Sequence, residues 1–171
     1  MNRDAIISEC GKFRYLLSRT WNTDLQPLLF VMLNPSTADA RVDDATIRRC
    51  VNFARAHGRF GGIEVVNLFA YRATDPTDLR RAGLPVGPEN DAHISAAAAR
   101  AGAVCAAWGA TKDADDRIQV VGPLLRRAGH ELLCLHITRS GYPGHPLYLA
   151  SSKRLQPYSL AAIEHAMHGG D

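Results

Sequence analysis

LLFVMLNPSTAD, residues 28–39, begins as a hydrophobic run and ends abruptly in polar residues and a proline. A short apolar segment that stops in this way is typical of a buried strand that leads into a shaped loop. The sequence therefore predicts a core strand over 28–32 and a turn at Asn34 and Pro35. Taken alone, Asn34 is explained better by a turn cap than by a functional role.

Similar apolar segments recur along the chain, and amphipathic segments separate them. Strands are predicted over 63–69, 103–108 and 130–137, and helices over 43–58, 89–101, 113–128 and 158–168, with a loop over 72–88. Alternating strands and helices indicate βαβ units and a mostly parallel sheet. We therefore expect one α/β domain over 1–171, a three-layer α/β/α sandwich whose sheet has about four strands. A hairpin of 14–17 and 28–32 is expected to precede it.

Composition places the chain among ordinary globular proteins. It has 171 residues, 46% of them hydrophobic, and a net charge of +3, which argues only weakly for a polyanionic partner. Its apolar runs are too short to cross a bilayer, and its first residues lack the apolar stretch of a signal peptide. We expect a cytoplasmic protein with no membrane partner.

Common metal and cofactor motifs are missing from the sequence. The cysteines at 10, 50, 105 and 134 form no CxxC pair, which argues against a metal or iron–sulfur site. Dinucleotide-binding, P-loop, serine-hydrolase and zincin motifs are absent as well. The aspartates at 39, 43 and 44 precede a predicted helix, where capping explains them better than a cation. We expect neither a metal nor a cofactor.

Each of the predicted core strands ends in unusual polar residues or leads directly into them. They are Asn34–Thr37, Asn67 with Tyr71 and Arg72, Trp108 with Gly109, and Thr138–Arg139 with Gly144–Pro146. In a parallel sheet these groups meet at the carboxyl edge, where ligands bind. Functional side chains are therefore expected on this edge.

Two of these side chains carry the most information. The Asn67 amide lies in an apolar strand, so its polar atoms need partners or cost about 1–3 kcal/mol. It either braces a loop or recognises an amide-bearing ligand such as a base. His145 lies between Gly144 and Pro146, which fix its loop, and it is either structural or functional.

The carboxylate-free segment 139–154 is either a phosphate-facing rim or a solvated loop.

The stretches MLNPST (32–37), IEVVNLFAYR (63–72), VCAAWGA (104–110) and GHPLYL (144–149) resemble, in this order, the motifs of the uracil-DNA glycosylase superfamily. The resemblance covers residues 28–155. The chain, with its MLNPSTAD and HPLYL, is also similar to a bacterial and phage family of small proteins of unknown function. That second likeness implies no activity.

The resemblance implies a glycosylase-like hydrolase that cleaves the N-glycosidic bond of a base in DNA. Asn34 would hold the attacking water, Asn67 would pair with the extruded base, and His145 would stabilise the departing base. The other implied base-binding residues are Pro35, Ser36, Thr37, Phe69, Tyr71, Trp108 and Gly109. Those implied to contact phosphates are Arg139, Ser151, Ser152, Lys153 and Arg154.

The sequence departs from the superfamily at several motif positions. Met32 and Ser36 replace glycines, and Leu147 replaces a serine that contacts phosphate. The loop before the first helix has no aromatic residue, so Phe69 or Tyr71 would have to stack on the base. A modified or mismatched base is therefore expected rather than ordinary uracil. Two alternatives stay open: a non-catalytic module that binds nucleotides or nucleic acid, and a hydrolase or transferase that acts on a free nucleoside or nucleotide.

Overall fold

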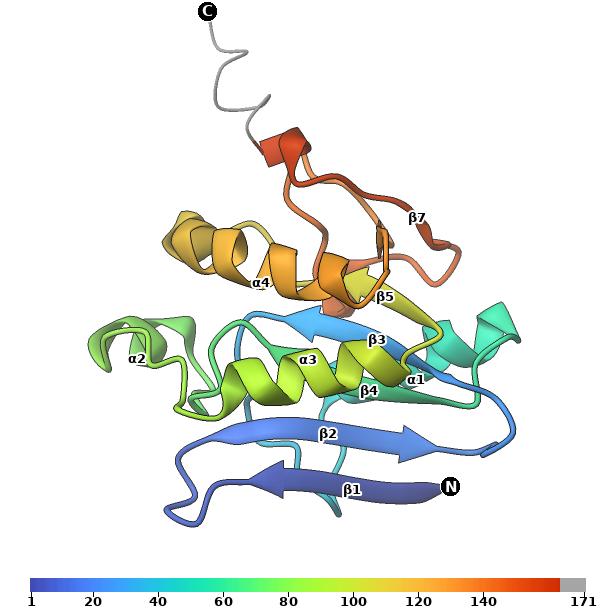
Figure 1. Ribbon diagram of the computed structural model, residues 1–171, viewed down its shortest axis with the longest axis horizontal. Coiled ribbons are helices and arrows are strands. Elements are labelled where there is room, and N and C mark those ends of the chain that lie inside the picture. The colour runs from blue at the N-terminus through green and yellow to red at the C-terminus, as the bar shows by residue number, and fades with distance from the viewer. Residues whose placement is uncertain (164–171) are drawn as a thin grey trace, which may run out of the picture.

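The structure, a computed structural model, describes residues 1–163. Its centre is a sheet of seven strands in the order β1-β2-β4-β3-β5-β6-β7 (Figure 1). The strands are β1 Asn2–Ile7, β2 Arg14–Thr20, β3 Pro27–Met32, β4 Gly62–Asn67, β5 Ala103–Ala106, β6 Leu132–Cys134 and β7 Gln156–Pro157. The helices are α1 Ala45–His57, α2 Pro76–Arg81, α3 Asn90–Arg100 and α4 Asp115–Arg127, with short 3-10 turns η1 Lys112–Ala114 and η2 Pro146–Tyr148.

Parallel strands form the middle of the sheet. β3 lies between β4 and β5, with Phe30 opposite Val65 on one side and Cys105 on the other, and β6 follows β5. The outer strands run antiparallel to their neighbours. β1 and β2 extend the sheet beyond β4, and β7 extends it beyond β6. The carboxyl ends of β3, β4, β5 and β6 therefore lie on the same edge of the sheet.

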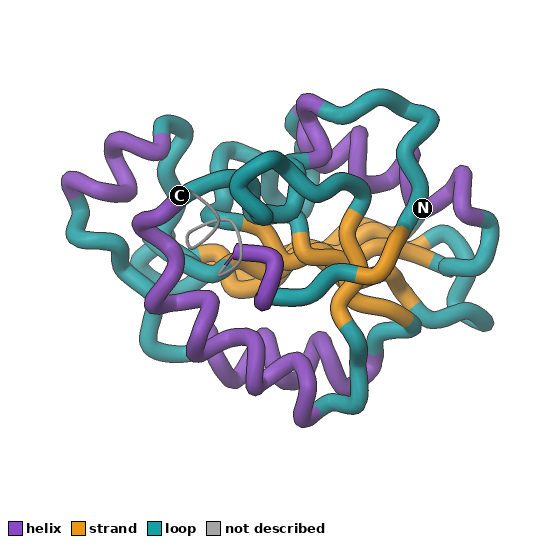
Figure 2. The backbone as a smooth tube through the Cα atoms, turned by 90° about the horizontal axis from the view of Figure 1, so that it is seen from above, coloured by secondary structure: helices purple, strands orange, loops and turns teal. Residues whose placement is uncertain are grey.

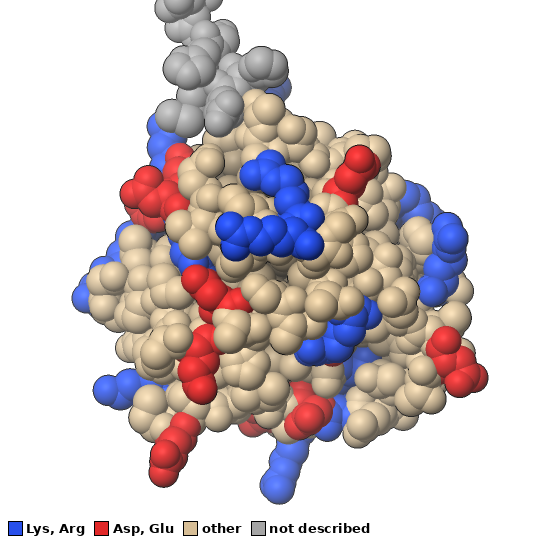
Figure 3. All heavy atoms as spheres, viewed as in Figure 1, with Lys and Arg blue, Asp and Glu red and all other residues tan. Residues whose placement is uncertain are grey.

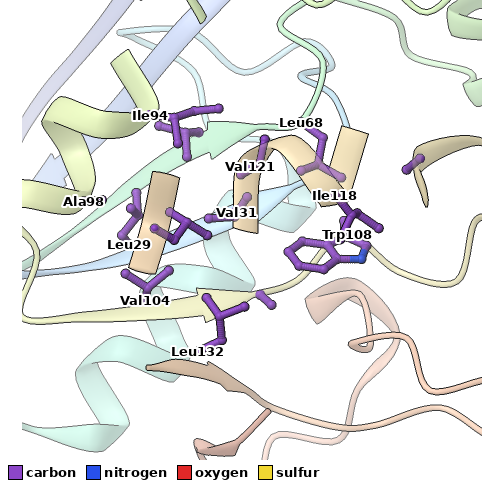
Figure 4. Packing of buried hydrophobic residues seen from close by; sticks show 14 of the residues in the cluster. Leu29, Val31, Leu68, Ile94, Ala98, Val104, Trp108, Ile118, Val121 and Leu132 are labelled. Atoms are coloured by element: carbon purple, nitrogen blue, oxygen red, sulfur yellow. The ribbon is translucent and has the colours of Figure 1, made fainter. Parts of the chain in front are cut away.

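Helices cover both faces of the sheet, as Figure 2 shows. Leu29 and Val31 of β3 belong to the cluster that contains buried residues of α3 and α4. Figure 4 shows this cluster from close by. Leu28, Phe30 and Met32 alternate with them and belong to the cluster that contains buried residues of α1. Each fully buried side chain of this size contributes about 1.5–3 kcal/mol to folding, which explains why the stretch at 28–32 forms the central strand.

Helix α1 has the ends that its sequence predicts. The Asp44 carboxylate accepts a hydrogen bond from the Ile47 amide at 2.9 Å, and Gly58 closes the helix with a φ of +78°. Side-chain capping of this kind stabilises a helix by about 1 kcal/mol. The prediction of a helix between Asp43 and Gly58 is confirmed.

The expected α/β class is confirmed, but the expected strand number and hairpin are wrong. β2 does not pair with β3, because Leu17 lies opposite Val65 and β4 separates the two strands. The edge strand β1 was missed because most of its residues are exposed and its apolar pattern is short. Helix α2 lies in the segment expected to be a loop, where Asp75 caps it and Pro76 begins it.

The remaining boundaries differ mainly in length. The strand expected over 130–137 is limited to β6, Leu132–Cys134. The helix expected over 158–168 is helical at 161–163 and otherwise lies largely outside the described residues.

Cys50, Cys105 and Cys134 are buried free thiols, whereas Cys10 is exposed. Among the described residues, no helix has both the length and the apolar character needed to cross a membrane.

Candidate functional site

A cavity of about 750 Å³ lies at the carboxyl ends of the central strands. It forms beside β3 and β5, which are neighbours in the sheet and are followed by helices on opposite faces, α1 and α4. Loops that leave neighbouring strands towards opposite faces open a crevice, and α/β proteins place ligands there. The position of the cavity thus follows from the topology.

Most of the base-binding residues expected from the sequence line this cavity. Seven do so: Asn34, Ser36, Thr37, Asn67, Trp108, Gly109 and His145. They come from the loops after β3 and β5, from the end of β4 and from the loop that precedes η2. The structure therefore brings together four sequence segments that are separated by tens of residues.

The Asn34 amide joins two of the loops. Its Nδ2 donates to the Pro35 carbonyl at 3.0 Å and to the Ala73 carbonyl at 2.8 Å. These bonds occupy both amide hydrogens and leave Oδ1 as the atom available to a ligand or water. Asn34 thus both braces the loop and presents an acceptor at the cavity wall.

Asn67, the last residue of β4, has the most unusual environment in the cavity wall. Its side chain is 1% exposed, and neither Nδ2 nor Oδ1 has a hydrogen-bond partner within residues 1–163. Buried polar atoms are nearly always paired, and one left without a partner costs about 1–3 kcal/mol. An unpaired donor and an unpaired acceptor therefore lie side by side just beneath the surface of the cavity wall.

Trp108 and Gly109 follow β5 and form another part of the wall. The indole of Trp108 lies at the edge of the cluster in Figure 4, and its Nε1 has no partner within the described part of the chain. Gly109 has a φ of +79°, and a Cβ there would lie 3.6 Å from the Cβ of His145. Gly109 also donates its amide to the Pro143 carbonyl at 3.0 Å, which holds the two loops together.

The orientation of the His145 ring is set by its own loop. Nδ1 accepts a hydrogen bond from the Leu147 amide at 3.2 Å, so the neutral ring carries its proton on Nε2. Burial lowers the pKa of His145, and the nearby Asp44 carboxylate opposes this shift only in part. His145 is therefore a neutral hydrogen-bond donor at neutral pH.

The profile of one protein family, described as "Protein of unknown function (DUF1643)", matches residues 14–147. The chain belongs to the DUF1643 family. No curated protein and no solved structure matches it. The match to a family of unknown function, expected from MLNPSTAD and HPLYL, is confirmed. The comparisons do not link the chain to the uracil-DNA glycosylase superfamily, so that likeness stays a prediction.

The DUF1643 match contains every residue described so far in the cavity wall. Ser36 and Asp44 act together there, because the Ser36 hydroxyl donates to the Asp44 carboxylate at 2.8 Å while that carboxylate caps α1. The Asp44 carboxylate therefore accepts hydrogen bonds from the Ser36 hydroxyl and from an amide in the first turn of α1. Ser36 accordingly fixes the loop that carries Asn34.

Other residues expected at the site lie outside the wall of this cavity. Phe69 is 4% exposed within the hydrophobic core, and Tyr71 forms an isolated bridge with Phe13. Neither is among the described residues that line the cavity, and neither are Pro35, Arg139, Ser151, Ser152, Lys153 and Arg154. Lys153 instead contacts the lining residue His136, with Nζ 3.3 Å from Nδ1. Ser151 accepts a hydrogen bond from Arg49 at 3.0 Å.

Arg49 of α1 was missed by the sequence analysis, although it holds the η2 segment in place. Its guanidinium donates to the carbonyls of Pro146 and Leu149 and lies over the Phe53 ring. The contacts span about a hundred residues of sequence, so no local pattern predicts them. They place His145 and Tyr148 against the cavity, with the two rings 5.5 Å apart.

Arg14, Arg80, His136 and Tyr148 also line the cavity and were not predicted. Tyr148 is 82% exposed, which is unusual for a large aromatic side chain beside a cavity. The HPLYL motif was the available signal, but it does not show which side chain faces solvent. On the face with α3 and α4, basic and acidic side chains are interspersed (Figure 3).

No group of three or more His, Cys, Asp or Glu side chains within residues 1–163 is placed to hold a metal ion. The groups that line the cavity include two amides, two imidazoles, an indole, two arginines, several hydroxyls and the Asp44 carboxylate. The amides, imidazoles, indole and arginines hydrogen-bond planar heteroatom-rich molecules and anions.

Proposed function

We propose that the cavity binds a nucleobase and that the protein hydrolyses the N-glycosidic bond of a modified or mismatched base in DNA. The observation that carries the proposal is the buried Asn67 amide, which has an unpartnered donor and an unpartnered acceptor in the cavity wall. Nucleobase edges present acceptors and donors side by side, and an Asn side chain pairs with such an edge through two hydrogen bonds. Binding a base would remove the cost of burying this amide.

The residues around Asn67 suit the chemistry of base release. Breaking a glycosidic bond gives an oxocarbenium-like sugar, and the bonding electron pair leaves with the base. His145, neutral and protonated on Nε2, would donate a hydrogen bond to the base as negative charge develops on it. This step requires a donor rather than a nucleophile.

Asn34 would position the water that completes the reaction. Its Oδ1 is the free end of an amide whose hydrogens are held by two carbonyls, so it can accept a hydrogen bond from water. The water oxygen would bond to the sugar carbon after the base has departed and would then lose its proton to solvent or to the released base. An amide suffices for this role, because a cationic sugar does not need an activated water.

Tyr148 supplies an aromatic surface that the sequence analysis sought in Phe69 or Tyr71. It lines the cavity, lies beside His145 and is largely exposed, so its ring is free to stack on a base that has left the DNA helix. Stacking on an aromatic ring is worth about 1–3 kcal/mol per base.

The test is a mass-spectrometric screen for bases released from DNA that contains deaminated, alkylated and other modified bases. Wild-type protein should release at least one such base. His145→Ala should reduce release by about 10²–10³-fold, as expected when a donor to the developing charge is lost. Asn34→Ala should also reduce release, because the water loses the acceptor that positions it. Asn52→Ala, which changes an exposed asparagine of α1 outside the cavity, is the matched control.

The screen also separates the proposal from its main alternative. Absence of release from every substrate would refute the hydrolase. If the same DNA still binds, with an affinity that depends on Asn67 and falls steeply with salt, the protein is a binding module instead.

A further inference from the structure

Arg14 is a buried cation in the cavity wall that lacks a carboxylate partner among the described residues. Within residues 1–163, three arginines are buried: Arg14 (3% exposed), Arg19 (0%) and Arg117 (7%). Arg19 is paired with Asp43 at 2.7 Å, and Arg117 is paired with Asp91. Within residues 1–163, Arg14 has no carboxylate oxygen within 4.0 Å, and its Nε has no hydrogen-bond partner. Its one side-chain hydrogen bond runs from Nη1 to the Ala38 carbonyl at 2.8 Å.

A β-bulge directs this side chain to the cavity. The pairing of β1 with β2 shifts between Ile6 and Ile7, so that Ile6 lies opposite Leu16 and Ile7 opposite Arg14. Tyr15 stacks on His93 of α3, and Leu16 belongs to the cluster that includes residues of α3, so two successive side chains lie on this face. Arg14 then points to the opposite face, towards Ala38 and the cavity. Bulges frequently re-aim a side chain beside a functional site.

The start of β2 reaches the site because β2 is antiparallel. Its residues Leu17 and Arg19 lie opposite Val65 and Ile63 of β4, so the beginning of β2 lies beside the carboxyl end of β4. Arg14 therefore joins Asn67 at the cavity from a neighbouring strand.

The Arg14 side chain keeps its positive charge in this environment. The pKa of Arg14 is lowered to about 10, chiefly by burial; Asp44 and Asp39 oppose this shift, and the cations Arg72 and Arg19 add to it. The side chain thus remains protonated at neutral pH. The Asp44 carboxylate is already bound to the Ile47 amide and the Ser36 hydroxyl, so it acts on Arg14 only at a distance. A buried charge that lacks a partner is costly, and an anion in the cavity would offset that cost.

We propose that Arg14 binds a phosphate group of the ligand, so that the cavity accepts a nucleotide rather than a free base or nucleoside. The proposal rests on the proposed function, because Asn67 is taken to hold the base of the same nucleotide. A guanidinium presents parallel N–H donors that match phosphate oxygens, which makes arginine well suited to this contact. Its Nε–H has no hydrogen-bond partner within residues 1–163, and since this atom is buried, the paired contact requires the guanidinium to turn towards the phosphate.

The experiment measures binding by calorimetry for deoxynucleoside 5′-monophosphates, the corresponding deoxynucleosides, inorganic phosphate and a short single-stranded oligodeoxynucleotide. Wild-type protein should bind a monophosphate or the oligonucleotide more tightly than the nucleoside. Arg14→Gln should weaken phosphate-bearing ligands by about 10- to 150-fold, the range for a hydrogen bond to a charged group, and should leave nucleoside binding unchanged. Arg127→Gln is the control, since Arg127 is exposed and is not among the residues that line the cavity.

The probes separate the two proposals and the two sources of phosphate. Asn67→Ala should abolish discrimination between bases and leave the response to inorganic phosphate intact, so a failed base proposal would still allow the phosphate site to stand. Tighter binding of the monophosphate identifies a free nucleotide, and tighter binding of the oligonucleotide identifies a DNA phosphodiester.

Two results would overturn the phosphate site. One is an Arg14→Gln variant that keeps the full preference for phosphate-bearing ligands. The other needs only wild-type protein: inorganic phosphate that neither binds nor competes with a monophosphate or the oligonucleotide. If Arg14→Gln does not fold, Arg14→Lys, which keeps the charge but loses the paired donors, should show the same ranking of ligands with a smaller loss.

Discussion

Replacing Asn67 by leucine should stabilise the protein while it abolishes ligand binding. Leucine keeps the branched shape at Cγ and carries no polar atoms. The amide that it removes is 1% exposed and has two polar atoms without partners in the described part of the chain. Removal of such a group relieves a desolvation penalty of about 1–3 kcal/mol.

This gain can be measured as a change in melting temperature. For a protein of this size, each kcal/mol shifts the melting temperature by about 2–4 °C, so Asn67→Leu should raise it by about 2–12 °C. Urea unfolding at equilibrium gives the free energy directly and should show an unchanged dependence on denaturant. A stabilising substitution that destroys function is the pattern expected at a site built for a ligand.

Asn90 provides the matched control, because it is also a buried asparagine. Its Nδ2 donates to the carbonyls of Asn67 and Leu68 at 2.8 and 3.2 Å, although its Oδ1 has no partner among the described residues. Asn90→Leu should therefore lower the free energy of unfolding by about 1–3 kcal/mol. If Asn67→Leu lowers it as well, the Asn67 amide already makes stabilising contacts in the free protein, and the argument for a ligand at this position is refuted.

Two further predictions concern the loop that carries His145. Because the pKa of His145 is lower in the folded protein than in the unfolded chain, the unfolded state binds more protons below about pH 6.5, so stability should fall as the pH drops through this range. Urea unfolding at several pH values should show a smaller loss for His145→Gln, and equal pH dependence in both proteins would contradict the lowered pKa. Arg49→Met removes donors to Pro146, Leu149 and Ser151, so amide hydrogen exchange over 146–151 should become faster and ligand affinity should fall. Arg48→Met, on the exposed side of α1, should leave exchange in that segment unchanged, and equal effects of the two variants would show that the Arg49 contacts do not hold the loop.

The parts of the fold that the sequence predicted are those with dense local signals. The strand at 28–32 is continuously apolar because helices cover both its faces, and Asp44 and Gly58 mark the ends of α1. The order of strands was not predictable in the same way. The pattern of β2 shows that it is a strand, but its partners depend on contacts far along the chain, and β4 rather than β3 lies beside it.

The same distinction between local and long-range signals separates the site residues that were predicted from those that were missed. Asn34, Asn67 and His145 were found because each follows a recognisable strand or lies in a rigid motif, and they do line one cavity. Arg14 was missed because it begins an antiparallel strand and a bulge sets its direction, and neither feature can be inferred from local sequence. The role expected of Lys153 as a phosphate contact remains untested, since in the structure it lies beside His136.

The two hydrogen bonds of the Asn34 amide also limit how this site can evolve. A single base change in the gene converts asparagine to aspartate, which elsewhere would turn a water-holding residue into a general base. Here the new carboxylate would face the carbonyl oxygens of Pro35 and Ala73 with no hydrogen to donate, so it would be repelled or would have to take up a proton. The backbone hydrogen bond from the Ala73 amide to the Pro35 carbonyl, at 2.9 Å, would remain, but the two side-chain bonds that brace these loops would be lost. We therefore expect the site to tolerate changes in the loops around Asn34 better than the loss of its neutral amide.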